Sequence, residues 1–382
     1  TEPHIGDLTF FRIYSGKVAV GDDVQNSTQQ TNERIGQLFI TNGKNRTEVD
    51  ELSAGDIGVT VKLRSTKTGD TLCDKKAPII YPPVEFPKPL VAEKVVPKNK
   101  GEEDKIAQGL ARLHDEDPTF FFEVDSELHQ TLVYGQGELH LDLVVQKLQE
   151  RFNVEVELKK PRIPYRETIT RTATKRYRHK KQTGGAGEFA EVEMRIEPLE
   201  RGEGFEYEWD IFGGAISSSF ESSVEKGVKQ AMSEGVIAGY PVVDVKTVIV
   251  DGKEHPVDSK DVAFQKCARE VFRQAFMEAG PIMLEPILNL EVTVPESFTG
   301  DVMGDISSRR GRIQGMEPVG KNFQKIIAKV PQAELYKYST VLRSMTQGRG
   351  WFTQEFSHYE TMPKEIADKV IREAKTETEQ EE

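Results

Sequence analysis

The sequence of 382 residues lacks several features by which protein classes are recognised. It has only two cysteines, Cys73 and Cys267, which lie far apart, so we expect neither a disulfide framework nor a zinc site. No run of 18 apolar residues occurs, which argues against a membrane-spanning helix. The first residues, TEPHIGDLTF, have no basic or apolar region typical of a signal peptide. These absences predict a cytoplasmic protein with no membrane partner.

Motifs for nucleotide binding and catalysis are missing as well. The pattern GxxxxGK[ST] does not occur, so we predict no P-loop in this chain. Gly135-Gln136-Gly137 lacks a third glycine and is interpreted as a tight turn into a helix. His140 lies on an amphipathic segment without a second ligand at a suitable spacing, so it is interpreted as a packing or capping residue. We therefore expect no catalytic residue, no metal site and no cofactor in this chain.

The pattern of strands and helices predicts a multidomain α+β fold. Residues 1–84 resemble a small β-barrel of short strands, and four prolines within 81–89 predict an extended linker. Residues 85–160 follow the order βαββαβ of a ferredoxin-like domain, and the same order returns in 282–362. Between these two ferredoxin-like domains, 161–281 reads as a different α+β domain. We expect a helix and an acidic tail without fixed structure in 363–382.

The strongest local signal is a basic segment within an acidic chain. The whole chain carries a formal charge of −12, but residues 159–181 contain ten Lys and Arg against one Glu, a net +9. Such density favours phosphate contacts because each contact releases counterions. The alternative is a solvated edge strand, on which lysines prevent aggregation. Interleaved rings that could stack on bases are those of Tyr165, Tyr177 and His179. The residues predicted to contact RNA here are Arg178, Lys180 and Lys181.

Two loop segments and an arginine cluster extend this hypothesis. The glycines of Thr183-Gly184-Gly185-Ala186-Gly187 allow close approach to a phosphate, or else form a flexible hairpin tip. His255 lies beside Pro256 in a turn, where exposed contacts are made. The arginines at the end of a predicted helix either complement the helix dipole or contact RNA. This cluster consists of Arg309, Arg310 and Arg312.

The motifs in order along the chain resemble elongation factor G, the ribosomal translocation GTPase. They are FFRIYSG, TGDTLCD, GELHLD, PYRETI, KKQTGG, AGYPVVD, VDSKDVAF, MLEP, GDVMGDISSRRG and LRSMTQGRG. The resemblance begins inside the family's second domain. It implies a C-terminal part with domains two to five, lacking the GTPase domain and the first strand of the barrel. GTP and Mg²⁺ are then expected only in that missing N-terminal domain, so that the full-length parent is expected to be a GTPase.

The resemblance also implies partners and site residues. It implies a monomer that binds the ribosome, through ribosomal RNA and ribosomal proteins, and contacts transfer RNA. The fourth domain, whose fold is similar to the second domain of ribosomal protein S5, is expected to carry the contacts in tip loops 181–188 and 251–257. From these loops, the residues implied to contact RNA are Gly184, Gly185, Gly187, Glu188 and His255.

The tip departs from the usual pattern of the family, SGGRGQYGH. Ala186, Glu188 and Glu191 stand where that pattern has Arg, Gln and His, and two carboxylates are expected to repel phosphate. The ending EFSHYETMP followed by a helix resembles the divergent second paralogue of the factor. Two functions therefore remain: GTP-linked translocation of transfer RNA and messenger RNA, or ribosome recycling or protection without a full translocase role.

Overall fold

The computed structural model describes residues 6–181 and 187–381. The chain divides into two compact units, Thr1–Arg162 and Ile163–Glu382. Within the described ranges, every helix is too short or too polar to cross a membrane.

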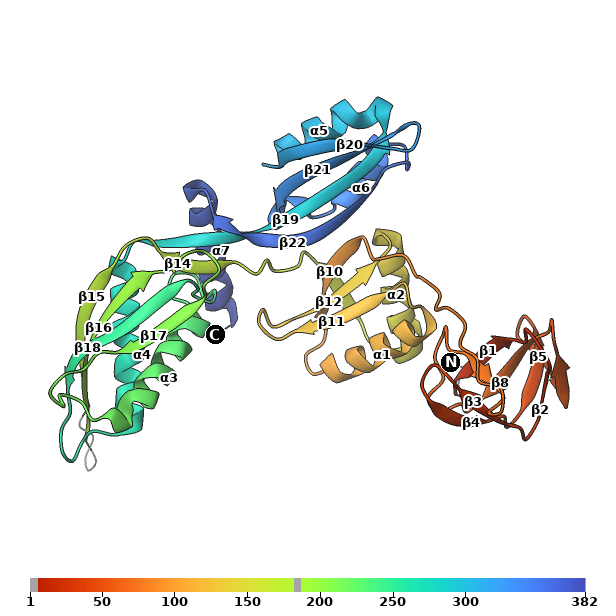
Figure 1. Cartoon of the computed structure of the whole chain (residues 1–382), viewed down its shortest axis with the longest axis horizontal. Helices are drawn as coiled ribbons and strands as arrows, with labels where there is room; N and C mark the ends of the chain where they lie inside the picture. Colours follow the sequence, from red (N-terminus) through yellow and green to blue (C-terminus); the bar gives the residue numbers. More distant parts are fainter. Residues whose placement is uncertain (1–5, 182–186, 382) are drawn as a thin grey trace. The chain divides into compact units, whose positions relative to one another are not determined.

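The N-terminal region of the first unit consists of short strands in three small sheets (Figure 1). The sheet orders are β1-β8-β5-β6, β4-β3-β9 and β2-β7. The strands are β1 (Leu8–Arg12), β2 (Lys17–Ala19), β3 (Asp23–Asn26), β4 (Thr31–Arg34), β5 (Leu38–Asn42), β6 (Asn45–Val49), β7 (Glu51–Ser53), β8 (Ile57–Val61) and β9 (Leu72–Cys73). The expected all-β region is present, but its described strands pair as three sheets and not as one closed barrel. The apolar stretch from Leu8 is broken because Gly16 has a φ of 72°, outside the strand region.

Residues 74–89 link these sheets to the next domain as an exposed segment without helix or strand. The next six elements are β10 (Val91–Pro97), α1 (Glu103–Glu116), β11 (Phe121–Asp125), β12 (Gln130–Gly135), α2 (Glu138–Phe152) and β13 (Val156–Lys159). Their antiparallel sheet has the order β11-β12-β10-β13. Leu110 of α1 and Leu141 and Leu148 of α2 are buried with Val95 and Val133 of the sheet. This is the predicted ferredoxin-like arrangement.

The second unit contains a four-stranded sheet, here called the central sheet, in the order β15-β16-β18-β17. Its strands are β15 (Ala173–Lys181), β16 (Glu188–Pro198), β17 (Phe205–Trp209) and β18 (Val245–Lys253), and its helices are α3 (Glu221–Glu234) and α4 (Asp261–Glu278), preceded by a 3₁₀ turn at Ser218–Phe220. The helices bury Val228 and Phe264 against Val192 and Met194 of β16. Charged side chains line the opposite face, because successive strand residues point to opposite sides.

A second sheet, the C-terminal sheet, has the order β14-β19-β21-β20, with β22 paired to β19. Its strands are β14 (Arg166–Ile169), β19 (Pro281–Pro295), β20 (Arg312–Val319), β21 (Phe323–Pro331) and β22 (Trp351–Thr361). Its helical elements are two 3₁₀ turns at Glu296–Phe298 and Gln332–Leu335 with α5 (Thr299–Ser308) and α6 (Tyr338–Met345). Strand β19 is continuous across the expected domain boundary at 281/282, and its first residues pair with β14. The domain boundaries therefore stay predictions.

Three local expectations are corrected. The second helix of the βαββαβ order expected in 282–362 is confined to α6, because Lys337 adopts a left-handed φ of 57° immediately before it. The acidic tail is helical, since α7 runs over Lys364–Glu381. Its Glu, Lys, Gln and Ala residues are good helix formers. The segment DGK, expected as a turn, is the end of β18, where a side chain on Gly252 would meet the Glu191 carbonyl oxygen at 2.2 Å.

Candidate nucleic-acid interface

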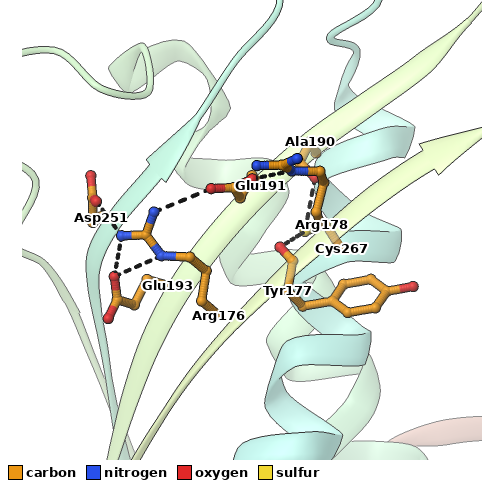
Figure 2. Close-up of polar contacts among 8 residues, drawn as sticks. All are labelled: Arg176, Tyr177, Arg178, Ala190, Glu191, Glu193, Asp251 and Cys267. Carbon is orange, nitrogen blue, oxygen red and sulfur yellow. Dashed lines mark hydrogen bonds and ion pairs between the residues drawn. The ribbon is translucent and has the colours of Figure 1, made fainter.

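Strand β15, the last part of the basic segment 159–181, is the edge strand of the central sheet. Its even-numbered residues Arg176, Arg178 and Lys180 lie on the open face. Arg176 contacts three carboxylates from the neighbouring strands, as Figure 2 shows: Glu191, Glu193 and Asp251. Glu193 and Asp251 raise the pKa of the Arg176 guanidinium. Arg176 is therefore committed to an ion network within the sheet.

Arg178 is paired in the same way with Glu191 (Figure 2). The Glu191 side chain is only 6% exposed, and its burial opposes ionisation. The hydrogen bonds from Arg178 and Arg176 outweigh that burial and lower the pKa of Glu191. The carboxylate expected to repel phosphate is thus ionised but neutralised by two arginines. The net +9 counted along the sequence overstates the free positive charge.

Two lysines at the end of β15 differ from these arginines. Lys180 and Lys181 are exposed, and neither forms an ion pair with any residue that the structure describes. Lys180 lies opposite Phe189 and Lys181 opposite Glu188 in the ladder between β15 and β16. They adjoin residues 182–186, so the predicted contacts Gly184 and Gly185, with Thr183 and Ala186, lie outside the described residues.

Glu188 is partly buried, and two side chains of the protein bind its carboxylate. Its carboxylate accepts hydrogen bonds from Lys266 Nζ of α4 at 2.9 and 3.0 Å. His179 Nε2 lies 2.8 Å from the same carboxylate. The bonds from His179 and Lys266 lower the pKa of Glu188 to about 2. Glu188 therefore anchors β16 to α4, and Lys266, which the sequence interpretation missed, offsets its charge.

The structure brings the two predicted tip segments together. A side-chain carbon on Gly187 would lie 2.6 Å from Asp258 Oδ1, so the backbone at Gly187 closely approaches the Asp258 side chain. The Phe189 N–H donates to the Asp258 carbonyl oxygen at 2.9 Å. The rings of Phe189 and His255 have centroids 6.0 Å apart. Because the segments are about 65 residues apart in sequence, only folding makes them one site.

The rings expected to stack on bases are placed elsewhere. Tyr165 is 9% exposed and packs edge-on against Tyr240. Tyr177 packs against the core beneath the central sheet, and His179 is turned toward Glu188. Strand alternation is the reason, since odd-numbered positions of β15 face α4. Phe189, on the open face, is the ring that the sequence interpretation missed, although its alternation with Ala190 and Val192 is visible in the sequence.

Each of the three arginines after α5 forms an ion pair with a carboxylate of α5 or of the C-terminal sheet. Arg309 donates to Asp305 Oδ2 at 2.8 Å and to the Glu334 carbonyl oxygen at 2.6 Å. Arg310 forms two 2.7 Å hydrogen bonds with the buried Glu285. Arg312 pairs with Glu360 but keeps 58% of its side chain exposed. Contact with RNA stays a prediction for all three, and Arg309 and Arg310 have clear structural roles.

Cys267 lies in the hydrophobic core of the second unit. Cys267 is buried beneath the central sheet, where its thiol contacts the carbonyl oxygens of Tyr177 and Ala190 (Figure 2). Burial raises the pKa of this thiol to about 12, so it is a poor nucleophile. In the described parts of the chain, no three His, Cys, Asp or Glu side chains are grouped as metal ligands.

Models of translation-factor domains match four consecutive segments of the chain. They are elongation factor Tu domain 2 over 6–73, elongation factor G domain III over 86–160, elongation factor G domain IV over 161–293 and the elongation factor G C-terminus over 282–370. Both segments of the candidate interface lie within the match to domain IV.

Individual relatives agree with these matches. An elongation factor G from Ruegeria sp. (strain TM1040) is 46% identical over 369 residues, which cover 97% of this chain and 52% of the relative. A crystal structure of a protein from Thermus thermophilus superposes with a TM-score of 0.85 and 36% identity, over 98% of this chain and 56% of that one. The chain thus spans about half the length of these relatives. It belongs to the elongation factor G family.

Proposed function

We propose that this chain is the ribosome-binding portion of a cytoplasmic elongation factor G-like protein that promotes GTP-linked translocation of transfer RNA and messenger RNA. The observation that carries this proposal is the joined tip at the end of the central sheet. There, the exposed Lys180 and Lys181 lie opposite Phe189 and Glu188 in the strand ladder. The ring centroid of Phe189 lies 6.0 Å from that of His255, while the neighbouring Arg176 and Arg178 are neutralised. Membership of the family and the match to domain IV support the assignment.

In this proposal the contribution of the chain is mechanical. The two lysines bind RNA phosphates, and the exposed His255 turn adds contacts that depend on shape. GTP and Mg²⁺ would bind in the GTPase domain of the longer protein. The acidic remainder of the chain discourages indiscriminate RNA binding, because its negative charge repels the negatively charged phosphates.

Equilibrium binding of the 382-residue chain to purified 70S ribosomes at about 50–200 mM salt tests the proposal. The variant Lys180→Gln/Lys181→Gln should bind more weakly, and its slope of log affinity against log salt should fall by about one per lysine. The matched control is Lys226→Gln/Lys364→Gln, which removes two exposed lysines that have no ion pair among the described residues. Equal slopes for wild type and Lys180→Gln/Lys181→Gln would exclude the proposed contact.

Ribosome recycling or protection is the second candidate, suggested by the tip that departs from the family pattern at Glu188 and Glu191. Both carboxylates are paired within the protein, which weakens the argument that they repel RNA. A peptide-synthesis assay with the longer protein as the sole translocation factor separates the candidates. Sustained synthesis supports translocation, and ribosome binding without synthesis supports recycling or protection.

A further inference from the structure

A single hydroxyl joins the two segments of the tip. Ser259 Oγ donates to the Phe189 carbonyl oxygen at 2.8 Å and accepts from the His255 N–H at 2.8 Å. The Ser259 N–H donates back to the His255 carbonyl oxygen at 3.2 Å. A serine hydroxyl has one proton to donate, and here that proton goes to β16. Ser259 therefore fixes the turn that carries His255 to the strand that carries Phe189.

The His255 ring is oriented by its own turn. Its Nδ1 lies 3.2 Å from the Asp258 backbone nitrogen and 3.4 Å from that of Val257, and both N–H groups point toward it. Asp258 Oδ2 lies 3.4 Å from the same ring nitrogen. An Nδ1 that accepts two N–H groups places the ring proton on Nε2. Half of the side chain is exposed, and Nε2 has no partner within the described residues.

We propose that Ser259 is a positioning residue for the RNA contact. It acts through His255, which makes the contact. The hydroxyl holds the turn so that the Nε2–H of His255 is offered to a hydrogen-bond acceptor on RNA, a phosphate or ribose oxygen. The Phe189 ring lies next to the His255 ring, with centroids 6.0 Å apart. This inference rests on the proposed function, because it assigns a ligand group to the same tip. It predicts that Ser259 acts on binding without touching RNA.

The first test compares Ser259→Ala with Ser259→Thr in the same 70S binding assay. Ser259→Ala should weaken binding about fivefold, as expected for one misplaced hydrogen bond. Ser259→Thr keeps the hydroxyl and should bind within about twofold of wild type. Unchanged affinity of Ser259→Ala, or equal losses for both variants, would overturn the role of the hydroxyl.

A double-mutant cycle then asks whether Ser259 acts through His255. Ser259→Ala should change the affinity less than about twofold in a His255→Ala background, because the oriented ring is already gone. A full loss of about fivefold in that background would show that Ser259 acts by another route and would refute the proposal.

Nitrogen-15 NMR of the histidine rings gives a readout that does not depend on binding or on the stability of a variant. At neutral pH the wild-type His255 should show an unprotonated Nδ1 and a protonated Nε2, and Ser259→Ala should move the ring toward a mixture. A wild-type ring protonated on Nδ1 alone would contradict the inference. The outcomes for Lys180→Gln/Lys181→Gln separate this inference from the proposed function. If those lysines matter but the cycle is additive, only the role of Ser259 fails.

Discussion

Glu167 is fully buried, and no Lys, Arg or His of the loop after α3 pairs with its carboxylate. Its carboxylate instead accepts four backbone N–H groups, those of Val236, Ile237, Ala238 and Tyr240, at 2.6–3.2 Å. Hydrogen bonds to an ionised acceptor are stronger than those between neutral groups. One side chain of β14 thus fixes the path of the chain between α3 and β18.

We expect Glu167→Ala to lower the free energy of unfolding of the second unit by about 3 kcal/mol, because four backbone N–H groups lose their buried acceptor. Urea unfolding followed by Trp209 fluorescence in a Trp351→Phe background measures this loss. The exposed Glu365 provides the control, and Glu365→Ala should change the free energy by less than about 0.5 kcal/mol. A small effect of Glu167→Ala would mean that the loop keeps its path without the carboxylate.

Single-residue roles were the hardest to predict from the sequence. PYRETI contributed to the family resemblance, but nothing local to Glu167 indicates partners about 70 residues away. The sequence predicts that Glu188 and Glu191 repel RNA. It does not show their partners, Lys266 and the arginines of β15, because only the fold places those side chains beside the carboxylates. The exposure of the turn at His255 is predicted from local chemistry, and the structure confirms this exposure.

At the scale of elements, Glu188 connects strands β15 and β16 to helix α4. Its pKa of about 2 lies below the ordinary value of 4.5, so the folded state favours the ionised form. Stability from this group is complete above the unfolded pKa and is lost as pH falls toward the folded pKa. The contribution is therefore present at neutral pH and declines in acid.

We expect Glu188→Gln to lower the thermal unfolding midpoint of the second unit at pH 7, and the gap to wild type to shrink as pH falls from about 4.5 toward about 2. Unfolding curves at several pH values, again followed by Trp209 in the Trp351→Phe background, measure the gap. Glu365→Gln serves as the control, with no gap at any pH. A Glu188→Gln gap that stays constant with pH would show that shape, and not charge, stabilises this junction.

Most elements were predictable because their signals are local. The apolar stripe of α1 and the alternation in β12 follow from the 3.6- and 2-residue periods of helices and strands. The failures were local conformations set by packing. Lys337 takes a left-handed φ between two core residues, Leu335 and Tyr338, which breaks the expected helix. DGK, composed like a turn, is held in β18 by pairing with β16.

At the scale of the whole molecule, the exposed segment 74–89 separates the N-terminal sheets from the ferredoxin-like domain. We expect trypsin to cleave early after Lys75 or Lys76, because this exposed chain is not held in helix or strand. Lys88 precedes a proline and should resist. Mass spectrometry should find fragments ending or beginning near residue 76, and these should vanish for Lys75→Gln/Lys76→Gln. Cleavage at sites within strands before cleavage after Lys75 or Lys76 would contradict the expected accessibility.

The sequence by itself determined the order of elements, the repeated βαββαβ unit and the family, because periodicity and motifs are properties of neighbouring residues. The tertiary structure alone decided which charges are free. Asp251 reaches Arg176 across 75 positions of sequence, and Lys266 reaches Glu188 across 78. Within the basic segment, Arg176 and Arg178 are thereby neutralised on the open face of the central sheet, whereas Lys180 and Lys181 are unpaired among the described residues. Charge acts over a few ångströms of space, and only folding sets those distances.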